Sequence, residues 1–260
     1  MLYAVIGGTG LQALAGDRAE RRFVRTRYGD VHLSVADVAG QEVAFLHRHG
    51  TEAKTPPHKV NYRANICALR SLGVKRILAA ASVGSLNERL QPGDFVILTQ
   101  FLDFTKSRAS TFFDEPDQPL VHISMDEPYC PDLRGELAQA GKSLGERLHV
   151  AGTYVCAEGP RFETPAEITM FRQLGGDVVG MTGVPEVVLA REANLCYALV
   201  AIVANWAAGL SREPLSQDAV TQAMVGYEPL VRSLLVAAIE RGSARTEECR
   251  CQRTVSAELA

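Results

Sequence analysis

The sequence is short of cysteine, of long apolar runs and of net charge. Its 260 residues hold six cysteines and carry a formal net charge of −3. Six scattered cysteines without a CxxC pair indicate neither a disulfide framework nor a zinc motif, so we expect no metal. The small negative charge provides no field that would hold a polyanion, and we expect no nucleic-acid partner. Any anion that the chain recognises must be small and bound locally.

No apolar run reaches the roughly 18 residues that a membrane-spanning helix needs. The N-terminus, MLYAVIGGTG, has no basic region before its short apolar run, which predicts a buried strand rather than a signal sequence. We therefore expect no membrane partner and a cytoplasmic location. The composition, 47% hydrophobic and 22% charged, is typical of a globular protein and excludes disordered and collagen-like classes.

Two of the cysteines, Cys249 and Cys251, lie in a polar segment at the C-terminal end. An exposed redox pair is one interpretation, and an incidental pair in an unstructured terminus is the one we favour. We expect residues 243–260 to form a polar, flexible tail. Most of the other cysteines are expected to be small core residues.

Apolar, β-branched runs alternate with segments of helical periodicity, which predicts the α/β class with a mixed central sheet flanked by helices. Turn signals between Phe23 and His47 predict a hairpin or meander there. No internal repeat or linker is visible, so we expect a single domain over residues 1–242. The predicted strands are 2–6, 31–35, 43–46, 76–81, 95–99, 178–181 and 196–203, and the predicted helices are 60–72, 132–148, 165–174, 185–193 and 216–239.

The glycine-rich turn Gly7-Gly8-Thr9-Gly10 follows the first apolar strand directly. Small residues there would let backbone N–H groups and the Thr9 hydroxyl approach an anion. A tight turn that needs the conformational freedom of glycine explains the same residues equally well. Gly8, Gly10 and Ala13 also have the spacing of a dinucleotide fingerprint, but the hairpin that follows is not the helix which that motif requires.

A basic cluster follows another strand. Arg48 and His49 stand at its carboxyl end, ahead of a loop that contains Pro56 and Pro57. A guanidinium and an imidazole are suited to holding phosphate. A solvated surface cluster is the alternative, and we favour phosphate because the cluster follows a buried run and the two prolines restrict the loop.

Three further strand ends carry aromatic or polar side chains. Phe162 and Glu163 precede a helix that Thr164 would cap, and an aromatic face beside a carboxylate suits a nucleobase. Thr182 and Asn205 follow two other strands, and capping alone would explain each of them. Because the carboxyl ends of strands in one sheet meet at a common edge, the five sites together predict a single ligand-binding crevice.

Together these motifs resemble those of the trimeric purine nucleoside phosphorylase and methylthioadenosine phosphorylase family. The resemblance runs in order from Met1 to about Val236. The segments that carry it are Gly7–Gly10, Arg48–Gly50, Pro57–Asn65, Gly84–Leu86, Gln91–Asp94, Glu158–Thr164 and Gly180–Glu186.

This resemblance implies phosphorolysis, a pentosyl transfer of purine salvage that needs no protein nucleophile, metal or cofactor and uses inorganic phosphate as co-substrate. It implies that Asn205 and His49 are catalytic, and that His122 reaches the sugar in a neighbouring subunit of a homotrimer. It assigns phosphate binding to Thr9, Arg48, His49, Ser82 and Thr182, and substrate contacts to Phe162, Glu163, Met181, Asn205, Ala207 and His122.

Two positions predict the choice of base. The adenine-preferring branch of the family carries acidic residues after the strand that ends here at Asn205, whereas this chain has Asn205 and Ala207. The Glu163 carboxylate would accept the N1–H of a 6-oxopurine, while adenine offers only a lone pair there. Two acceptors facing each other would cost about 1–3 kcal/mol, so we expect adenine nucleosides to be poor substrates.

The 5′ substituent of the sugar is less strongly specified. No histidine between Leu215 and Val220 is available to hold a 5′-hydroxyl, which favours a methylthio group, although Gln217 stands where a thioether pocket would have an apolar residue. We predict S-methyl-5′-thioinosine as substrate, then inosine or guanosine, and methylthioadenosine last.

Two other protein classes remain as alternatives. A nicotinamide-dependent oxidoreductase would rest on Gly8 and Gly10 alone. A non-catalytic nucleotide-binding protein would not need Arg48, His49 and Asn205 in one pocket.

Overall fold

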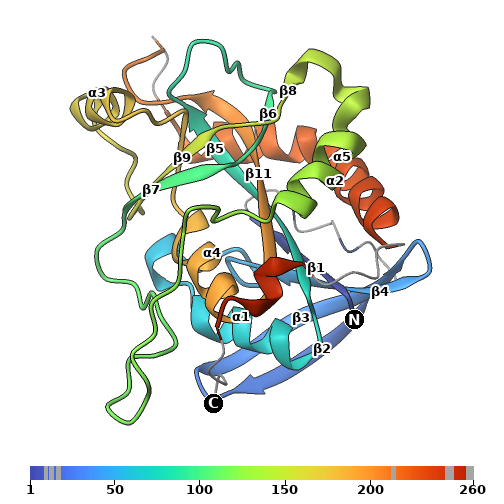
Figure 1. Ribbon diagram of the computed structural model, residues 1–260. Coiled ribbons are helices and arrows are strands. Elements are labelled where there is room, and N and C mark those ends of the chain that lie inside the picture. Colours follow the sequence, from blue (N-terminus) through green and yellow to red (C-terminus); the bar gives the residue numbers. More distant parts are fainter. Residues whose placement is uncertain (9–10, 12–14, 16–18, 212–214, 244–248, 256–260) are drawn as a thin grey trace.

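Two long apolar strands form the centre of the structure, a computed structural model that describes residues 1–8, 11, 15, 19–211, 215–243 and 249–255. Strand β5 (Arg76–Ser85) and strand β11 (Cys196–Trp206) pair in parallel along their whole length (Figure 1). Strand β1 (Tyr3–Gly7) pairs in parallel with β5 on one side and with β4 (Gln41–His47) on the other. Nearly every residue of these strands is buried, as their continuous apolar sequences predict.

The remaining strands extend this sheet with both parallel and antiparallel pairs. Strands β2 (Glu20–Thr26), β3 (Gly29–Val38) and β4 form an antiparallel meander, as predicted. Beyond β5 follow β10 (Val178–Gly180), β9 (Thr153–Ala157) and β7 (Gln100–Phe104). The short strands β6 (Phe95–Ile97) and β8 (Leu148–His149) continue from β11. The prediction of a mixed sheet in a single α/β domain is confirmed. The predicted strands did not include β7 and β8, which are partly exposed and carry polar residues, or the buried strand β9.

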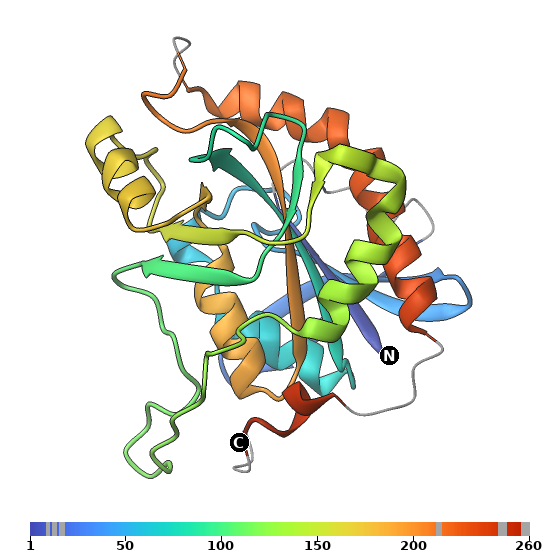
Figure 2. The same cartoon turned by 45° about the horizontal axis from the view of Figure 1, so that its top comes forward.

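Helices cover both faces of the sheet (Figures 1 and 2). Alternate residues of the central strands point to opposite faces, so that Ala4 and Ile6 of β1 join one core while Tyr3 and Val5 join the other. The first core includes buried residues of α1 (Tyr62–Ser71) and α4 (Gly183–Glu192), and the second includes those of α2 (Pro131–Ala140) and α5 (Gln217–Gly242).

Smaller elements complete the structure. Helix α3 (Pro165–Gln173) packs against a third apolar cluster through Ile168 and Phe171. The 3₁₀ helices are η1 (Pro57–Lys59), η2 (Gly141–Arg147) and η3 (Arg250–Arg253). No helix in the described part of the chain is long and apolar enough to cross a membrane.

One predicted helix is shorter than expected. The periodic pattern predicts a helix over 132–148, but α2 ends at Ala140 and is followed by the 3₁₀ segment η2. Two glycines explain the break, because Gly141 caps α2 and Gly145 adopts a φ of 61°, outside the helical region.

Residues 249–255 also differ from the prediction of a flexible tail over 243–260, while residues 244–248 and 256–260 of that prediction lie outside the described residues. Residues 249–255 contain η3 and pack onto the domain, where Cys249, Cys251 and Val255 are at most 8% exposed. The side chain of Asn194 makes two hydrogen bonds to the backbone of Val255, with distances of 2.7 and 2.8 Å. Apolar and thiol side chains thus anchor a segment whose composition is otherwise polar.

Candidate active site

A cavity of about 310 Å³ lies at the carboxyl ends of β4, β5, β10 and β11. Its volume lies within the range of small-molecule sites. The structure places the following predicted site residues in its wall: Arg48, His49, Ser82, Phe162, Glu163, Met181, Thr182, Asn205 and Ala207. Thr9 lies outside the described residues. His122 is exposed and does not line the cavity of its own chain.

Arg48 is held by a buried ion pair. Its Nε and Nη2 atoms each donate to a carboxylate oxygen of Glu186 at 2.7 Å, and both side chains are fully buried. Burial alone would lower the pKa of Arg48, but the charge of Glu186 raises it well above its usual value. The sequence predicts that the paired donors of Arg48 hold phosphate, whereas in the structure they face Glu186. One N–H remains on each terminal nitrogen, since Nη1 also donates to the Ala80 carbonyl.

His49 presents a defined nitrogen to the cavity. Its Nδ1 lies 2.8 Å from the carbonyl oxygen of Thr55, which can only accept, so Nδ1 carries a proton. Desolvation, together with the charge of Arg48, lowers the pKa of the imidazole below its usual 6.5. In the neutral ring, Nε2 is therefore a hydrogen-bond acceptor for a ligand in the cavity that His49 lines.

Thr182 lies at the turn between β10 and α4. Its backbone N–H and that of Gly183 donate to the Tyr154 hydroxyl, at 3.1 and 3.3 Å. The Thr182 hydroxyl does not cap α4, so helix capping does not explain this residue. It is therefore available to a ligand in the cavity.

A β-bulge aims Asn205 at the cavity. The pairing of β11 with β5 shifts by one residue between Val203 and Asn205, and Asn205 lies opposite Gly84. A Cβ at Gly84 would lie 3.3 Å from both the Asn205 amide nitrogen and the Cα atom of Ala207, so the glycine gives these two residues room. Asn205 Nδ2 donates to the Trp206 carbonyl at 2.7 Å. The amide oxygen and the second N–H are left for a ligand.

Glu163 carries an unsatisfied acceptor. Its Oε1 atom is buried and has no hydrogen-bond partner among the described residues. Desolvation raises the pKa of this carboxyl. A buried carboxylate oxygen without a donor is costly, so a ligand with an N–H at this point would stabilise it. Phe162 lines the cavity beside it and offers an aromatic face.

The start of α5 closes another part of the cavity. Ser216 caps the helix by accepting from the Ala219 N–H at 3.1 Å. Leu215, Gln217 and Val220 line the cavity from this end. At this end the wall of the cavity is thus mostly apolar, with the Gln217 amide as its polar group.

Several positioning residues were missed by the sequence analysis. Glu186 pairs with Arg48, Tyr154 fixes the turn at Thr182, and Thr55 sets the tautomer of His49. Arg108 holds the start of the long connection after β7 through an ion pair with Glu158 and bonds to nearby carbonyls. Apart from Thr55, which lies six residues after His49, these residues contact distant parts of the chain, and local sequence patterns carry no signal for such contacts.

The lowered pKa of His49 has a consequence for stability. As pH falls, His49 of the unfolded chain binds a proton near pH 6.5, before His49 of the folded chain does. The contribution of His49 to the free energy of unfolding is therefore complete above pH 6.5, and it is lost as pH falls through the lower folded pKa. We expect a His49→Gln variant to lose less stability than the parent between about pH 7.5 and pH 5.5. Urea unfolding at both pH values measures this. Equal losses in the two proteins would contradict it.

Helices on both faces of a mixed sheet thus enclose one cavity, whose wall holds Arg48 and His49 together with Phe162 and Glu163. The chain belongs to the phosphorylase superfamily, whose model matches residues 2–240.

Named relatives and solved structures agree with this family. The chain is 50% identical over 241 residues to the 6-oxopurine nucleoside phosphorylase of Pyrococcus furiosus, covering 91% of each protein. It is 49% identical to a probable S-methyl-5′-thioinosine phosphorylase of Methanopyrus kandleri, again over 91% of each. The methylthioadenosine phosphorylase of Schistosoma mansoni in complex with adenine superimposes with a TM-score of 0.89 at 36% identity, covering 94% and 93% of the two chains.

Proposed function

We propose that this protein is a transferase that splits a 6-oxopurine nucleoside with inorganic phosphate, releasing the free base and a sugar 1-phosphate. The observation that carries the proposal is the unpartnered Glu163 carboxylate oxygen in the same cavity as Arg48 and His49. The names of the relatives at about 50% identity support it.

In the proposed reaction, a phosphate oxygen bonds to C1′ of the sugar as the bond from C1′ to N9 of the purine breaks. The bonding electrons go to the purine, and the transition state has oxocarbenium character. The remaining N–H groups of Arg48 and the Thr182 hydroxyl would hold the phosphate, assisted by the backbone near Ser82. Neutral His49 would accept a proton of the phosphate at Nε2. The chain thus contributes positioning and charge stabilisation rather than a nucleophile.

At the other end of the cavity, Phe162 would pack against the base and Met181 against the ribose. Glu163 would accept the N1–H of hypoxanthine or guanine, which would offset the desolvation that raises its pKa. Asn205 would contact N7 and O6, which gain electron density as the base departs. Ala207, only 2% exposed, leaves this side of the base site without a charge.

For the 5′ position, we place S-methyl-5′-thioinosine first and inosine or guanosine second. Leu215 and Val220 provide an apolar wall for a methylthio group, and Gln217 is the feature that would accommodate a hydroxyl. Both substrate types occur among the names of the relatives at about 50% identity. We also place the protein in the cytoplasm, since all six cysteines are free, as in a reducing compartment.

We further propose a homotrimer in which His122 completes the site of a neighbouring subunit. His122 lies on the connection between β7 and α2, which extends away from the body of the protein (Figures 1 and 2). Leu120, two residues before it, is 84% exposed, as expected for a segment that packs against another chain.

We expect His122→Ala to raise the nucleoside KM by about tenfold, the effect of one lost hydrogen bond, without altering the fold. Steady-state kinetics measures this, and His32→Ala, an exposed histidine on β3, is the matched control. Sedimentation velocity on the parent should show a trimer. A fully active monomer would overturn the trimer.

The reaction itself is tested by product analysis with and without phosphate. Methylthioinosine should give hypoxanthine and methylthioribose 1-phosphate in equal amounts, and only when phosphate is present. Release of hypoxanthine without phosphate would indicate a hydrolase, and no turnover of any purine nucleoside would favour a binding protein.

A further inference from the structure

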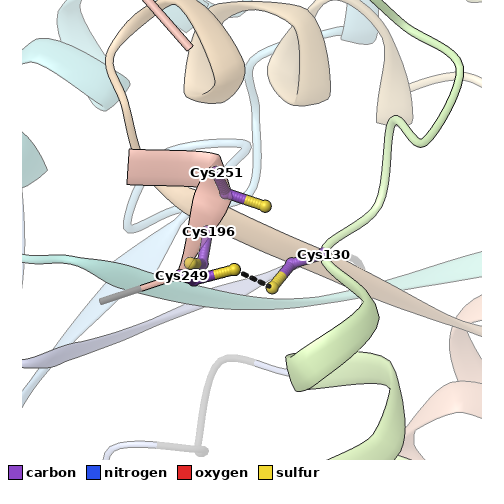
Figure 3. A group of neighbouring side chains, drawn as sticks. All are labelled: Cys130, Cys196, Cys249 and Cys251. Carbon is purple, nitrogen blue, oxygen red and sulfur yellow. Dashed lines mark hydrogen bonds between the residues drawn. The ribbon is translucent and has the colours of Figure 1, made fainter. Parts of the chain in front are cut away.

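Four of the six cysteines meet at one point, far from the cavity. Cys130 precedes α2, Cys196 begins β11, and Cys249 and Cys251 belong to the C-terminal segment 249–255 (Figure 3). Their four sulfur atoms all lie within 4.8 Å of one another, and all four residues are buried. It is the single such cluster of possible metal ligands among the described residues.

The spacing of the sulfurs fits coordination to one ion. Zinc binds thiolate sulfur at about 2.3 Å, so two sulfurs of a zinc tetrahedron lie about 3.8 Å apart. The Sγ atoms of Cys130 and Cys249 are 3.6 Å apart. All four cysteines are free, and a disulfide would require about 2.05 Å between two of these atoms. A closed shell of four cysteines is the ligand set of a structural rather than a catalytic zinc site.

The surrounding charge suits a thiolate cluster. Arg191 is only 9% exposed, and its Nε and Nη1 atoms have no hydrogen-bond partner among the described residues. Zinc with four thiolates carries a net charge of −2. The charge of Arg191 acts on Cys251, so this guanidinium would help to balance the charge of the cluster.

We propose that Cys130, Cys196, Cys249 and Cys251 bind a structural zinc ion that fastens the C-terminal segment to the start of β11. Binding would form four Zn–S bonds and release the thiol protons to solvent. The ion would join three parts of the chain, of which the start of α2 and β11 are already linked by a hydrogen bond from the Cys130 N–H to the Tyr197 carbonyl. Figures 1 and 2 show η3 beside the lower end of β11, where the Asn194 contacts to Val255 already hold the segment.

The site would act on stability and not on catalysis. Asn205 stands at the other end of β11, nine residues from Cys196, and a strand rises about 3.3 Å per residue. The cluster and the cavity are therefore separated by about 30 Å. Its loss should lower the melting temperature without changing the chemistry.

The first test is the metal content of the full chain, purified without a polyhistidine tag and without chelator. Elemental analysis should find about one zinc ion per chain in the parent and in Cys67→Ser, which removes a cysteine outside the cluster. Cys251→Ser should reduce the zinc content at least about tenfold. No zinc in the parent, or zinc that persists in Cys251→Ser, would overturn the proposal.

The second test does not depend on a variant that folds. Removing metal from the parent and adding Co²⁺ should give the strong visible absorption of a tetrahedral four-thiolate centre, which excess Zn²⁺ abolishes. A thiol count on the denatured parent, with chelator and without reductant, should find all six cysteines free. Disulfides in place of thiols, or no cobalt spectrum, would contradict a zinc site.

The third test separates this site from the proposed function. Chelation should lower the melting temperature of the parent by about 5–10 °C and leave that of Cys251→Ser unchanged. Phosphorolysis at 25 °C should change by less than about twofold, because the cluster does not reach the cavity. An equal effect of chelator on parent and variant would count against the zinc site whatever the outcome of the activity assays.

Discussion

Asn205→Ala is expected to lower kcat for phosphorolysis by about 10²–10³-fold while changing the nucleoside KM little. The purine gains electron density only as the glycosidic bond breaks, so the amide contact is stronger in the transition state than in the bound substrate. The bulge in β11 and the bond to the Trp206 carbonyl hold the amide in place before the substrate arrives. Steady-state kinetics with saturating phosphate measures the effect.

Acidic substitutions at positions 205 and 207 test whether Asn205 selects the base. Asn205→Asp combined with Ala207→Asp should shift preference from 6-oxopurine toward 6-aminopurine nucleosides. Ala207→Ser is a control that adds bulk without charge at this buried position. An unchanged ratio of methylthioinosine to methylthioadenosine turnover in the double variant would show that Asn205 does not select the base.

Glu186→Ala should destabilise the protein by about 3–5 kcal/mol, because it leaves the buried charge of Arg48 without its partner. It also removes the acceptor of the Tyr197 hydroxyl, which donates to Glu186 at 2.7 Å. Phosphate KM should rise, since Arg48 would no longer be held at the cavity. Urea unfolding and phosphate titrations measure the two effects.

A double variant separates stability from phosphate binding. Arg48→Met with Glu186→Gln removes both charges and keeps an acceptor for Tyr197. Most of the lost stability should return, because a neutral pair does not leave a charge buried alone. Phosphate KM should stay high. Normal phosphate kinetics in the double variant would show that Arg48 does not act on phosphate.

The sequence predicts the fold, and the edge of the sheet at which the site lies, for one physical reason. A buried strand needs a continuous apolar run, and the first polar residues after it must lie at the carboxyl edge of the sheet. Arg48 and Asn205 each follow such a run, and the cavity brings them together. Thr182 also lines the cavity, although the strand before it, β10, runs antiparallel to β5. Their order along the chain and the apolar runs before them are local features that can be read directly.

The partners of these residues are not local. Glu186 lies 138 residues from Arg48, and no spacing rule links the two. Nothing in the sequence distinguishes the buried Cys251 from an exposed one, because its burial depends on Cys130 and Cys196 across the fold. The polar composition of the tail therefore predicted flexibility where the structure shows a packed segment.

Base selectivity, measured as kcat/KM for methylthioinosine, inosine, guanosine and methylthioadenosine in parallel with saturating phosphate, tests the central claim most directly. The Glu163 acceptor should favour the 6-oxopurine members over methylthioadenosine by about 10–100-fold, the effect of about 1–3 kcal/mol for two acceptors that face each other. Turnover of methylthioadenosine that equals or exceeds that of every 6-oxopurine nucleoside would contradict it.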